Sequence, residues 1–234
     1  LFLDLAAADL VADFDAIMGS GYSVSLFTPW TEDRIQQVWV KNVAGDFTPP
    51  PALARATRAP KKMHPILHID PIHCTEQLGV AGPSYDRLPH FRMGFVPASG
   101  EELQVEYFVP YERASEVVAA MFGVGEKLKP LLMISELRTV AADDLWLSGS
   151  YRRKTIALHF SFQRDEPALR KLLPVLEEAI APFDPRPHWG KVFTMAPDIV
   201  RHRYEKMSNF RDLIVEHDMD GRFRNEYIER MIFG

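Results

Sequence analysis

The sequence contains a single cysteine, Cys74, among its 234 residues, so a disulfide within the chain is excluded. One cysteine fits a reducing compartment, and we expect a cytoplasmic protein. No apolar run approaches the roughly 20 residues that a membrane-spanning helix needs. Residues Leu1–Leu5 carry no basic group and reach an acid at once, which argues against a signal peptide. We therefore expect no membrane partner.

A surplus of positive charge is also lacking, since 27 lysines and arginines stand against 32 acidic residues and leave a net charge of -5. Proteins that bind nucleic acid use such a surplus to neutralise phosphates, so we expect no nucleic-acid partner. The motifs G-x-G-x-x-G, G-x-x-x-x-G-K-[ST] and G-x-S-x-G are absent as well. Nothing in the sequence is built to hold the phosphates of a dinucleotide.

What is present suffices for a core, because 47% of the residues are hydrophobic and 25% are charged. Period-2 segments predict strands at residues 22–28, 36–42, 90–96, 103–109, 131–140 and 155–162. Helical spacing predicts helices at residues 6–18, 111–127 and 166–181, with shorter helical pieces at 197–204, 210–217 and within 221–233.

Two connecting segments complete this pattern. Pro97–Gly100 could join two strands as a hairpin, and residues 43–88 form a long irregular segment with many prolines. Adjacent strands separated by single helices predict an α+β fold. We expect antiparallel sheets flanked by helices, with ferredoxin-like split β-α-β subdomains.

Residue types that bind metal ions gather in the irregular segment, namely His64, His68, Asp70, His73 and Cys74. Their spacing matches no recognised zinc pattern, and the prolines between them prevent a single helix from aligning them. We interpret the cluster as a proline-rich loop that contains histidines, and we expect no metal site.

A stronger candidate is a polar face on two predicted strands. Glu136 and Arg138 are two residues apart, as are His159 and Ser161, so each pair projects from one face of its strand. If the strands are neighbours, the four groups form a polar floor that suits a ligand rich in hydroxyl groups. The alternative is a solvent-facing surface with an incidental ion pair, and spacing alone favours it, because such pairs are common. Likewise, a histidine inside a strand is more often a core group than a general base, which also leaves the catalytic use of His159 or Glu136 open.

The segment Arg186–Lys191 (RPHWGK) brings a cation, an aromatic ring and an imidazole together in a rigid, non-helical stretch. Lys191 could stabilise an anion or a developing alkoxide. Equally, the segment could be a turn in which Trp189 packs on the core and Lys191 is solvated.

Several segments resemble those of bacterial alditol oxidases, also called xylitol oxidases, which are flavoproteins of the vanillyl-alcohol-oxidase type close to the aldonolactone oxidases. The resemblance is carried by residues 135–143, 158–161 and 186–191, with further matching stretches at 22–28, 74–80, 88–92, 100–104 and 220–225. The combination of H-W-G-K with E-x-R-T is fairly specific, whereas each motif alone is weak. The resemblance extends over the whole chain.

This resemblance implies an enzyme of two domains, one that binds FAD and one that caps the flavin and shapes the substrate pocket. Residues 1–234 would be the substrate-binding cap domain plus a C-terminal tail, without the FAD-binding domain. We therefore expect the isolated chain to be inactive, with FAD held mainly by the missing domain, and the protein to be a monomer.

The resemblance also implies roles for individual residues. Glu136 and Arg138 would lie over the flavin and contact substrate hydroxyls, His159 and Ser161 would line the same pocket, and Lys191 would sit near the reacting carbon. Arg138 and Lys191 are the predicted catalytic residues, because two cations would favour an alkoxide-like oxygen in the transition state. His188 is our candidate for contact with the cofactor.

The implied reaction is oxidation of a terminal hydroxyl of a polyol, such as xylitol or sorbitol, with O2 to an aldose and H2O2. Two other functions stay open. One is an aldonolactone oxidase or dehydrogenase of the D-arabinono-1,4-lactone type, and the other is a carbohydrate-binding module without redox activity.

Overall fold

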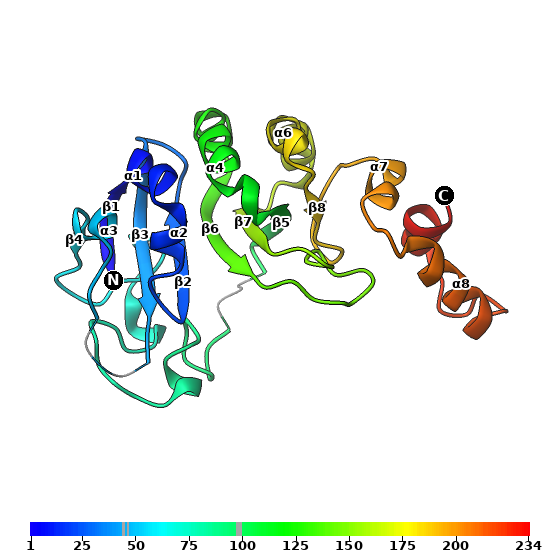
Figure 1. Ribbon diagram of the computed structural model, residues 1–234. Coiled ribbons are helices and arrows are strands. Elements are labelled where there is room, and N and C mark those ends of the chain that lie inside the picture. The colour runs from blue at the N-terminus through cyan, green and yellow to red at the C-terminus, as the bar shows by residue number, and fades with distance from the viewer. Residues whose placement is uncertain (44, 46, 97–99) are drawn as a thin grey trace.

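The computed structural model describes residues 1–43, 45, 47–96 and 100–234 (Figure 1). Within these residues one antiparallel sheet of eight strands has the order β4-β1-β3-β2-β6-β7-β5-β8. The strands are β1 (Phe2–Ala6), β2 (Ser23–Thr28), β3 (Arg34–Lys41), β4 (Thr57–Arg58), β5 (Glu102–Pro110), β6 (Leu132–Val140), β7 (Thr155–Gln163) and β8 (Arg186–Pro187). The helices are α1 (Ala7–Ala12), α2 (Phe14–Met18), α3 (Pro51–Ala54), α4 (Ala114–Phe122), α5 (Gly125–Leu128), α6 (Glu166–Ile180), α7 (Pro197–His202), α8 (Met207–His217) and α9 (Glu226–Ile228).

The sheet consists of two halves with the same topology. In each half the chain passes strand, helix, strand, strand, helix, strand, and the strand orders are β4-β1-β3-β2 and β8-β5-β7-β6. This is the split β-α-β arrangement that the sequence predicts. The halves meet where β2 pairs with β6, over Leu26–Thr28 and Ser135–Leu137. Because β2 and β6 would otherwise be edge strands, their pairing leaves no open edge at the centre of the sheet.

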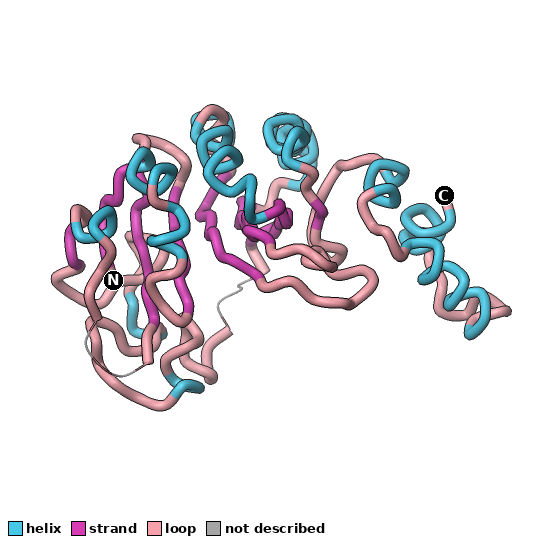
Figure 2. Tube along the Cα trace, in the orientation of Figure 1, coloured by secondary structure: helices cyan, strands magenta, loops and turns pink. Residues whose placement is uncertain are grey.

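The helices that connect the strands lie on one face of the sheet (Figure 2). The side chains of Leu137, Leu158 and Tyr107 point to this face and are fully buried. Helix α6 begins after Asp165, whose side chain accepts a hydrogen bond from the Ala168 N–H at 3.0 Å. Its apolar residues recur at helical spacing and are all buried, namely Leu169, Leu173, Leu176 and Ile180.

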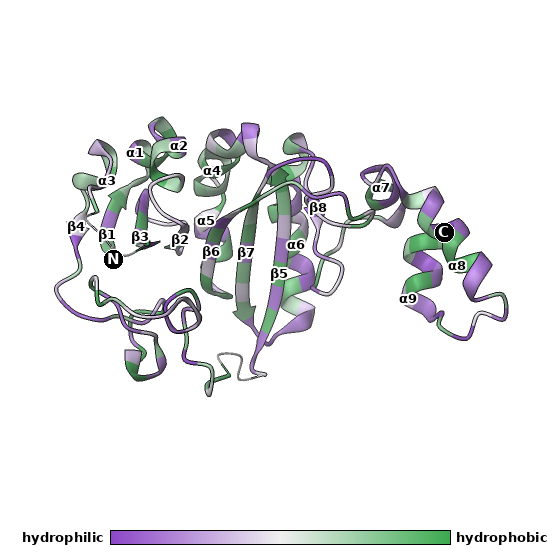
Figure 3. Ribbon diagram, turned by 60° about the horizontal axis from the view of Figure 1, so that its bottom comes forward, coloured by the Kyte–Doolittle hydropathy of each residue, from purple (hydrophilic) through white to green (hydrophobic). Residues whose placement is uncertain are grey.

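The opposite face of the sheet is covered only in part. Over β2 and β3 it is covered by the segment 61–96, which Gln37 anchors by donating hydrogen bonds to the carbonyls of His64 (2.9 Å) and Pro65 (3.1 Å). Phe27, Trp39 and Cys74 form a small apolar cluster beneath this segment. Among the described residues no comparable segment lies over β6, β7 and β5, and Figure 3 shows their face directly.

The C-terminal helices α7, α8 and α9 form a separate lobe beyond β8 (Figure 1). Their core contains Val200, Tyr204 and Met231, with Trp189 packed against it. No helix in the part of the chain that the structure describes is long and apolar enough to cross a membrane.

The predicted α+β class and the predicted strands at 131–140 and 155–162 are confirmed by β6 and β7. The strand predicted at residues 90–96 is wrong. Phe91 forms only an isolated bridge with Cys74, and the following residues turn. The residues are typical of strands, but the backbone of this segment pairs within the covering segment and not with the sheet. β propensity depends on such context. Residues 97–99 of the predicted hairpin connection lie outside the described residues.

Two predicted helices are shorter than expected, and three short strands were missed. The helix predicted at 6–18 is divided at Asp13, and the one predicted at 111–127 ends at Phe122. A helix resumes at Gly125, where a Cβ atom would lie 1.7 Å from the Trp30 carbonyl oxygen, so the close packing there requires glycine. The missed strands β1, β4 and β8 have five residues or fewer, which is too short for an alternating pattern to identify.

A core substitution in α6 tests this packing. Leu173→Ala should lower the free energy of unfolding by about 3 kcal/mol, because it removes a fully buried side chain and leaves a cavity. Lys171→Ala, an exposed position on the same helix, should change it by less than about 0.5 kcal/mol. Urea unfolding followed by circular dichroism measures both, and equal effects would contradict the described burial.

Candidate functional site

The register of three strands creates a row of polar side chains on the uncovered face of the sheet. Glu136 in β6 lies opposite His159 in β7, and His159 lies opposite Glu106 in β5. Residues directly opposite one another in an antiparallel pair share a face, and neighbouring strands lie about 4.8 Å apart. Arg138 and Ser161, two residues further along their strands, project from the same face. The sequence-based expectation that these strands are neighbours with a shared polar face is confirmed.

Glu106 is the central acid of this row, and the sequence reasoning missed it. Glu106 is only 5% exposed, and both of its carboxylate oxygens have a cationic partner. Lys191 Nζ lies 2.5 Å from Oε2, and Arg138 Nη2 lies 3.0 Å from Oε1. The alternating segment 103–109 contained the available signal. A strand with that alternation places Gln104 and Glu106 on the face opposite Val105 and Tyr107.

Lys191 belongs to the row because the segment after β8 is fixed to β5. The His188 N–H donates to the Glu106 carbonyl at 2.9 Å, and the Val192 N–H donates to the Gln104 carbonyl at 2.9 Å. The Lys191 side chain is 16% exposed, and its Nζ also donates to His159 Nδ1 at 2.9 Å. The alternative interpretation of this segment, a turn with a solvated Lys191, is therefore excluded for the lysine. The packing of Trp189 is found, but against the C-terminal lobe.

Arg138 bridges the two carboxylates. Besides its hydrogen bond to Glu106, its Nε atom lies 3.7 Å from Glu136 Oε2. Its side chain remains 43% exposed, whereas that of Glu136 is 12% exposed. The guanidinium therefore satisfies buried acids on one side and keeps donors available on the other.

A further residue, His90 from the covering segment, extends the row beyond Glu136. His90 Nε2 lies 3.0 Å from Glu136 Oε1, and His90 Nδ1 lies 2.8 Å from Lys41 Nζ. The prediction of a strand at 90–96 obscured this residue, and nothing in its spacing linked it to Glu136. The row therefore alternates in charge from Lys41 at one end to Lys191 at the other.

The charges lower the pKa of both acids although burial opposes this. Burial raises the pKa of Glu106, but the neighbouring His159, Lys191 and Arg138 outweigh it and hold the pKa at about 2. Burial likewise raises the pKa of Glu136, and the hydrogen bond from His90 and the charge of Arg138 lower it below its ordinary value. Both acids are therefore ionised near neutral pH. With neutral imidazoles, the cations of Lys41, Arg138 and Lys191 exceed these two acids by one charge.

His188, the predicted cofactor contact, lies beside the row and packs against a neighbouring aromatic ring. Its imidazole stacks on Phe108 with centroids 6.1 Å apart, and its Nδ1 accepts a hydrogen bond from the Gly190 N–H at 3.1 Å. Burial and the nearby charge of Lys191 lower the pKa of His188. The ring is thus neutral near pH 7, and its role as a cofactor contact stays a prediction.

Ser161 is the most weakly connected of the predicted residues. Its Oγ atom lies 3.4 Å from His159 Nε2. Among the described residues, no three His, Cys, Asp or Glu side chains gather in a way that could hold a metal ion. In the irregular segment that gathers histidines and Cys74, the cysteine is buried, and burial raises the pKa of its thiol to about 11.

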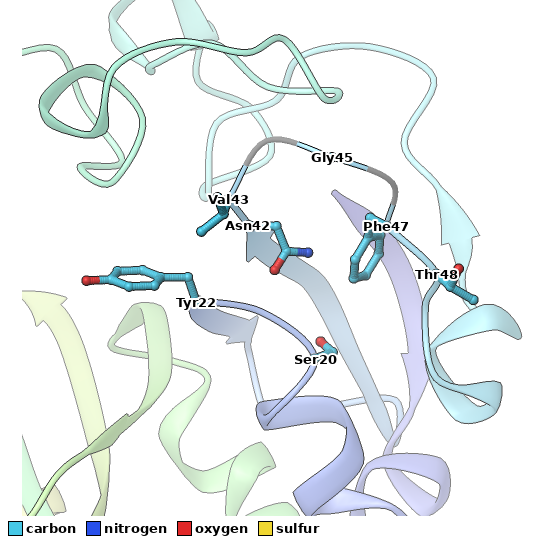
Figure 4. A pocket seen from close by; sticks show the side chains of 7 residues that line it. All are labelled: Ser20, Tyr22, Asn42, Val43, Gly45, Phe47 and Thr48. Carbon is cyan, nitrogen blue, oxygen red and sulfur yellow. The ribbon is translucent and has the colours of Figure 1, made fainter.

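Two hollows lie near one end of the row. One of about 210 Å³ lies where β2 and β6 diverge, and its lining includes Arg138, Thr139 and Tyr22. The other, of about 530 Å³, shares Tyr22 and lies next to Ser20, Asn42 and Phe47 (Figure 4). Neither is lined by Glu136, His159 or Lys191. The polar row is thus a floor beside these hollows and not the interior of either of them.

Comparison with known proteins identifies the family of the chain. The family profile described as D-arabinono-1,4-lactone oxidase matches residues 98–231, which include Glu106, Glu136, Arg138, His159 and Lys191. The chain belongs to the D-arabinono-1,4-lactone oxidase family. The family assignment covers β5 to β8 and nearly all of the C-terminal lobe.

Individual relatives agree with the family. The chain is 42% identical over all of its 234 residues to an alditol oxidase from Streptomyces sp. (strain IKD472 / FERM P-14339). It is 30% identical over 132 residues, or 55% of the chain, to an L-gulono-1,4-lactone dehydrogenase from Mycobacterium tuberculosis (strain H37Rv). The matched parts are 55% and 30% of those relatives, so the chain spans about half the length of the alditol oxidase. The resemblance to alditol oxidases is confirmed.

The low pKa of Glu106 links the row to the stability of the fold. The pKa of this carboxyl group is about 2 in the folded state against an ordinary value of 4.5, which implies a stabilisation of about 3 kcal/mol above pH 5. That stabilisation is lost as the pH falls from 4.5 towards 2, because the unfolded chain then binds the proton first. Glu106→Gln should therefore lower the free energy of unfolding near neutral pH, and its difference from the unsubstituted chain should shrink through this range.

Urea unfolding at a series of pH values measures this difference. Glu178→Gln, at an exposed position on α6, is the matched control and should show no such trend. A difference between Glu106→Gln and the unsubstituted chain that stays constant from about pH 7 to about pH 2 would contradict the described ion pairs.

Proposed function

We propose that the polar row is the substrate floor of an FAD-dependent alditol oxidase. The enzyme would oxidise a terminal hydroxyl of a polyol with O2, giving an aldose and H2O2. The observation that carries the proposal is a run of one acceptor, Glu136, and two donors, Arg138 and Lys191, which the buried Glu106 holds side by side. Each hydroxyl group of a polyol both donates and accepts a hydrogen bond, so such a run is complementary to a chain of them.

On this proposal the chain is the substrate-binding cap of a longer enzyme, followed by its C-terminal tail. A separate FAD-binding domain would close the floor, and the isolated chain would be inactive. Two features support this. The chain aligns with the C-terminal part of the alditol oxidase, and the uncovered face of β6, β7 and β5 offers a polar surface to a partner domain.

The side chains present fit a neighbouring flavin. The row carries one surplus positive charge, and Lys191 and Arg138 are its cations nearest the uncovered strands β5 and β7. His188 is our candidate for contact with the ring system. When bound, FAD would supply the acceptor for the hydride that leaves the substrate carbon, and O2 would take up the electrons.

The chain's own residues would bind and polarise the substrate. Glu136 Oε2 would accept a hydrogen bond from a substrate hydroxyl, since Oε1 already accepts one from His90. As the reacting hydroxyl releases its proton to water, negative charge develops on its oxygen, and Lys191 and Arg138 would stabilise that charge. His159 Nδ1 accepts from Lys191, so its Nε2 would carry the proton and donate towards Ser161 and the substrate.

A second candidate is an aldonolactone oxidase or dehydrogenase. It is favoured by the family profile and by the 30% identical L-gulono-1,4-lactone dehydrogenase. A lactone ring offers fewer hydroxyl groups than an open polyol of the same carbon number, so it would use less of the row. The third candidate, a carbohydrate-binding module without redox activity, would need only the floor.

One substrate screen separates these functions. The full-length protein that contains this chain should be purified with its flavin and assayed for H2O2 and for flavin reduction. Xylitol and sorbitol should be turned over in preference to D-arabinono-1,4-lactone and L-gulono-1,4-lactone. A strong preference for lactones would replace the first proposal with the second. Flavin that none of the four compounds reduces would contradict both.

Loss of the proposed catalytic lysine gives a second test. Lys191→Met keeps a long side chain but removes the charge that would stabilise the developing alkoxide. It should lower kcat for the preferred polyol by about 100-fold to 1000-fold, as loss of a comparable donor does elsewhere. Lys127→Met, at an exposed position in α5, should leave kcat unchanged. A Lys191→Met enzyme with retained flavin and unchanged kcat would exclude the proposed role.

A further inference from the structure

The carboxylate of Glu136 is held on two sides. On one side lies Arg138 of the same strand, whose Nε is 3.7 Å from Oε2. On the other lies His90, from a distant part of the chain, whose Nε2 is 3.0 Å from Oε1. Ser25 of β2 contacts both, since it hydrogen-bonds to Glu136 and its Oγ lies 3.2 Å from His90 Nε2. His90 comes from the segment 61–96, to which neither the sequence motifs nor the proposed function assigns a role.

The ring of His90 is fixed in place by aromatic packing. Phe27 and Trp39 meet it edge-on, with centroids 5.5 Å and 5.1 Å from the imidazole. Its side chain is 19% exposed. A ring confined between two aromatic side chains on the sheet has little freedom to turn away from Glu136.

The backbone of His90 is fixed as well. The Thr75 N–H donates to the His90 carbonyl at 3.0 Å, and the Thr75 hydroxyl donates to the Pro89 carbonyl at 2.7 Å. Thr75 is buried, and the residues beside this contact, Cys74 and Phe91, form an isolated β-bridge. These contacts within the covering segment therefore hold His90 against the sheet, although this part of the chain has almost no regular secondary structure.

Lys41 determines which nitrogen of His90 carries the proton. An ammonium group has donors only, and Lys41 Nζ lies 2.8 Å from Nδ1, so Nδ1 must accept. In the neutral ring the proton then resides on Nε2, which points at Glu136 Oε1. Burial lowers the pKa of Lys41 to about 8, against the raising effect of Glu136, so the ammonium form persists at neutral pH. Lys41 also donates to the Leu88 carbonyl, which holds it in place.

We propose that His90 is a positioning residue for substrate binding, which acts by donating its Nε2–H to Glu136, with Lys41 selecting the required tautomer. His90 commits one oxygen of Glu136 and leaves the other, Oε2, to accept from a substrate hydroxyl. This inference rests on the proposed function. It assigns the covering segment a part in the site that its lack of regular structure conceals.

A matched pair of amide variants tests the role in the full-length holoenzyme. The amide nitrogen of His90→Gln can reach the place of Nε2, whereas that of His90→Asn is too short. His90→Asn should raise KM for the preferred polyol by about 10-fold to 100-fold and change kcat by less, the loss expected for a hydrogen bond to a charged group. His90→Gln should keep KM within about threefold of the unsubstituted enzyme. His68→Asn, an exposed position on the same segment, should change neither constant.

A double-mutant cycle shows whether His90 acts through Glu136. If it does, His90→Asn should add little to the effect of Glu136→Gln on KM. Effects that simply multiply, or equal losses in the Asn and Gln variants, would overturn the proposal and leave His90 a packing residue. Flavin content and Tm of each variant identify those that fail to fold. If His90→Asn is one of them, the cycle is run with His90→Phe, which keeps an aromatic ring in the packing and removes the donor.

The hydrogen bond itself can be tested without turnover, by 15N NMR of the histidine-labelled chain of 234 residues. His90 should show the neutral ring protonated at Nε2, and both Lys41→Met and Glu136→Gln should shift its ring nitrogen signals. Protonation at Nδ1, or signals that neither substitution moves, would overturn the inference whatever the substrate. If instead the NMR result holds but the full-length protein oxidises no polyol or lactone, the proposed function fails, and the kinetic role of His90 fails with it.

Discussion

The register of β6, β7 and β5 is the constraint on which the site depends. It places Glu136, His159 and Glu106 side by side on one face, and the apolar residues between them on the other. Because successive residues alternate, a slip of one residue in any of these strands would turn a polar residue of the row towards α4 and α6 and an apolar residue towards the open face. The helices that bury Leu137 and Leu158 therefore also determine the orientation of the polar row.

That constraint has an electrostatic counterpart. A carboxylate as buried as Glu106 would be costly without partners, and here it has both Arg138 and Lys191. Arg138 comes from β6, which is separated from β5 by β7, and Lys191 comes from a segment held to β5 by backbone hydrogen bonds. The same ion pairs that offset the burial of Glu106 also bring the two cations to adjacent places on the floor. In this row, stability and the arrangement of the charges come from the same contacts.

Local periodicity could predict part of this site, and contacts between distant segments could not be predicted in this way. The two-residue spacing of Glu136 and Arg138 predicted their shared face, and the short link between their strand and that of His159 predicted the pairing. The same alternation in 103–109 contained Glu106, but only the pairing of β5 with β7 brings that acid beside His159. The part of His90 in the row could not be predicted from periodicity, because its position depends on contacts with Thr75, Phe27 and Trp39. The predicted strand at 90–96 failed for the same reason, since the backbone of Phe91 pairs with Cys74 in a loop and not with a strand.

The anchoring of Trp189 in the C-terminal lobe ties the end of the chain to Lys191. The Trp189 indole N–H donates to the Leu147 carbonyl at 2.9 Å, and the Tyr227 hydroxyl donates to the Trp189 carbonyl at 2.9 Å. Lys191 follows two residues after this anchor, so the lobe works as a bracket for its backbone. Fusions or truncations at the C-terminus that disturb Tyr227 would therefore change the position of Lys191, although α9 lies beyond the far edge of the sheet (Figure 1). The C-terminal lobe is thus part of the framework that positions Lys191.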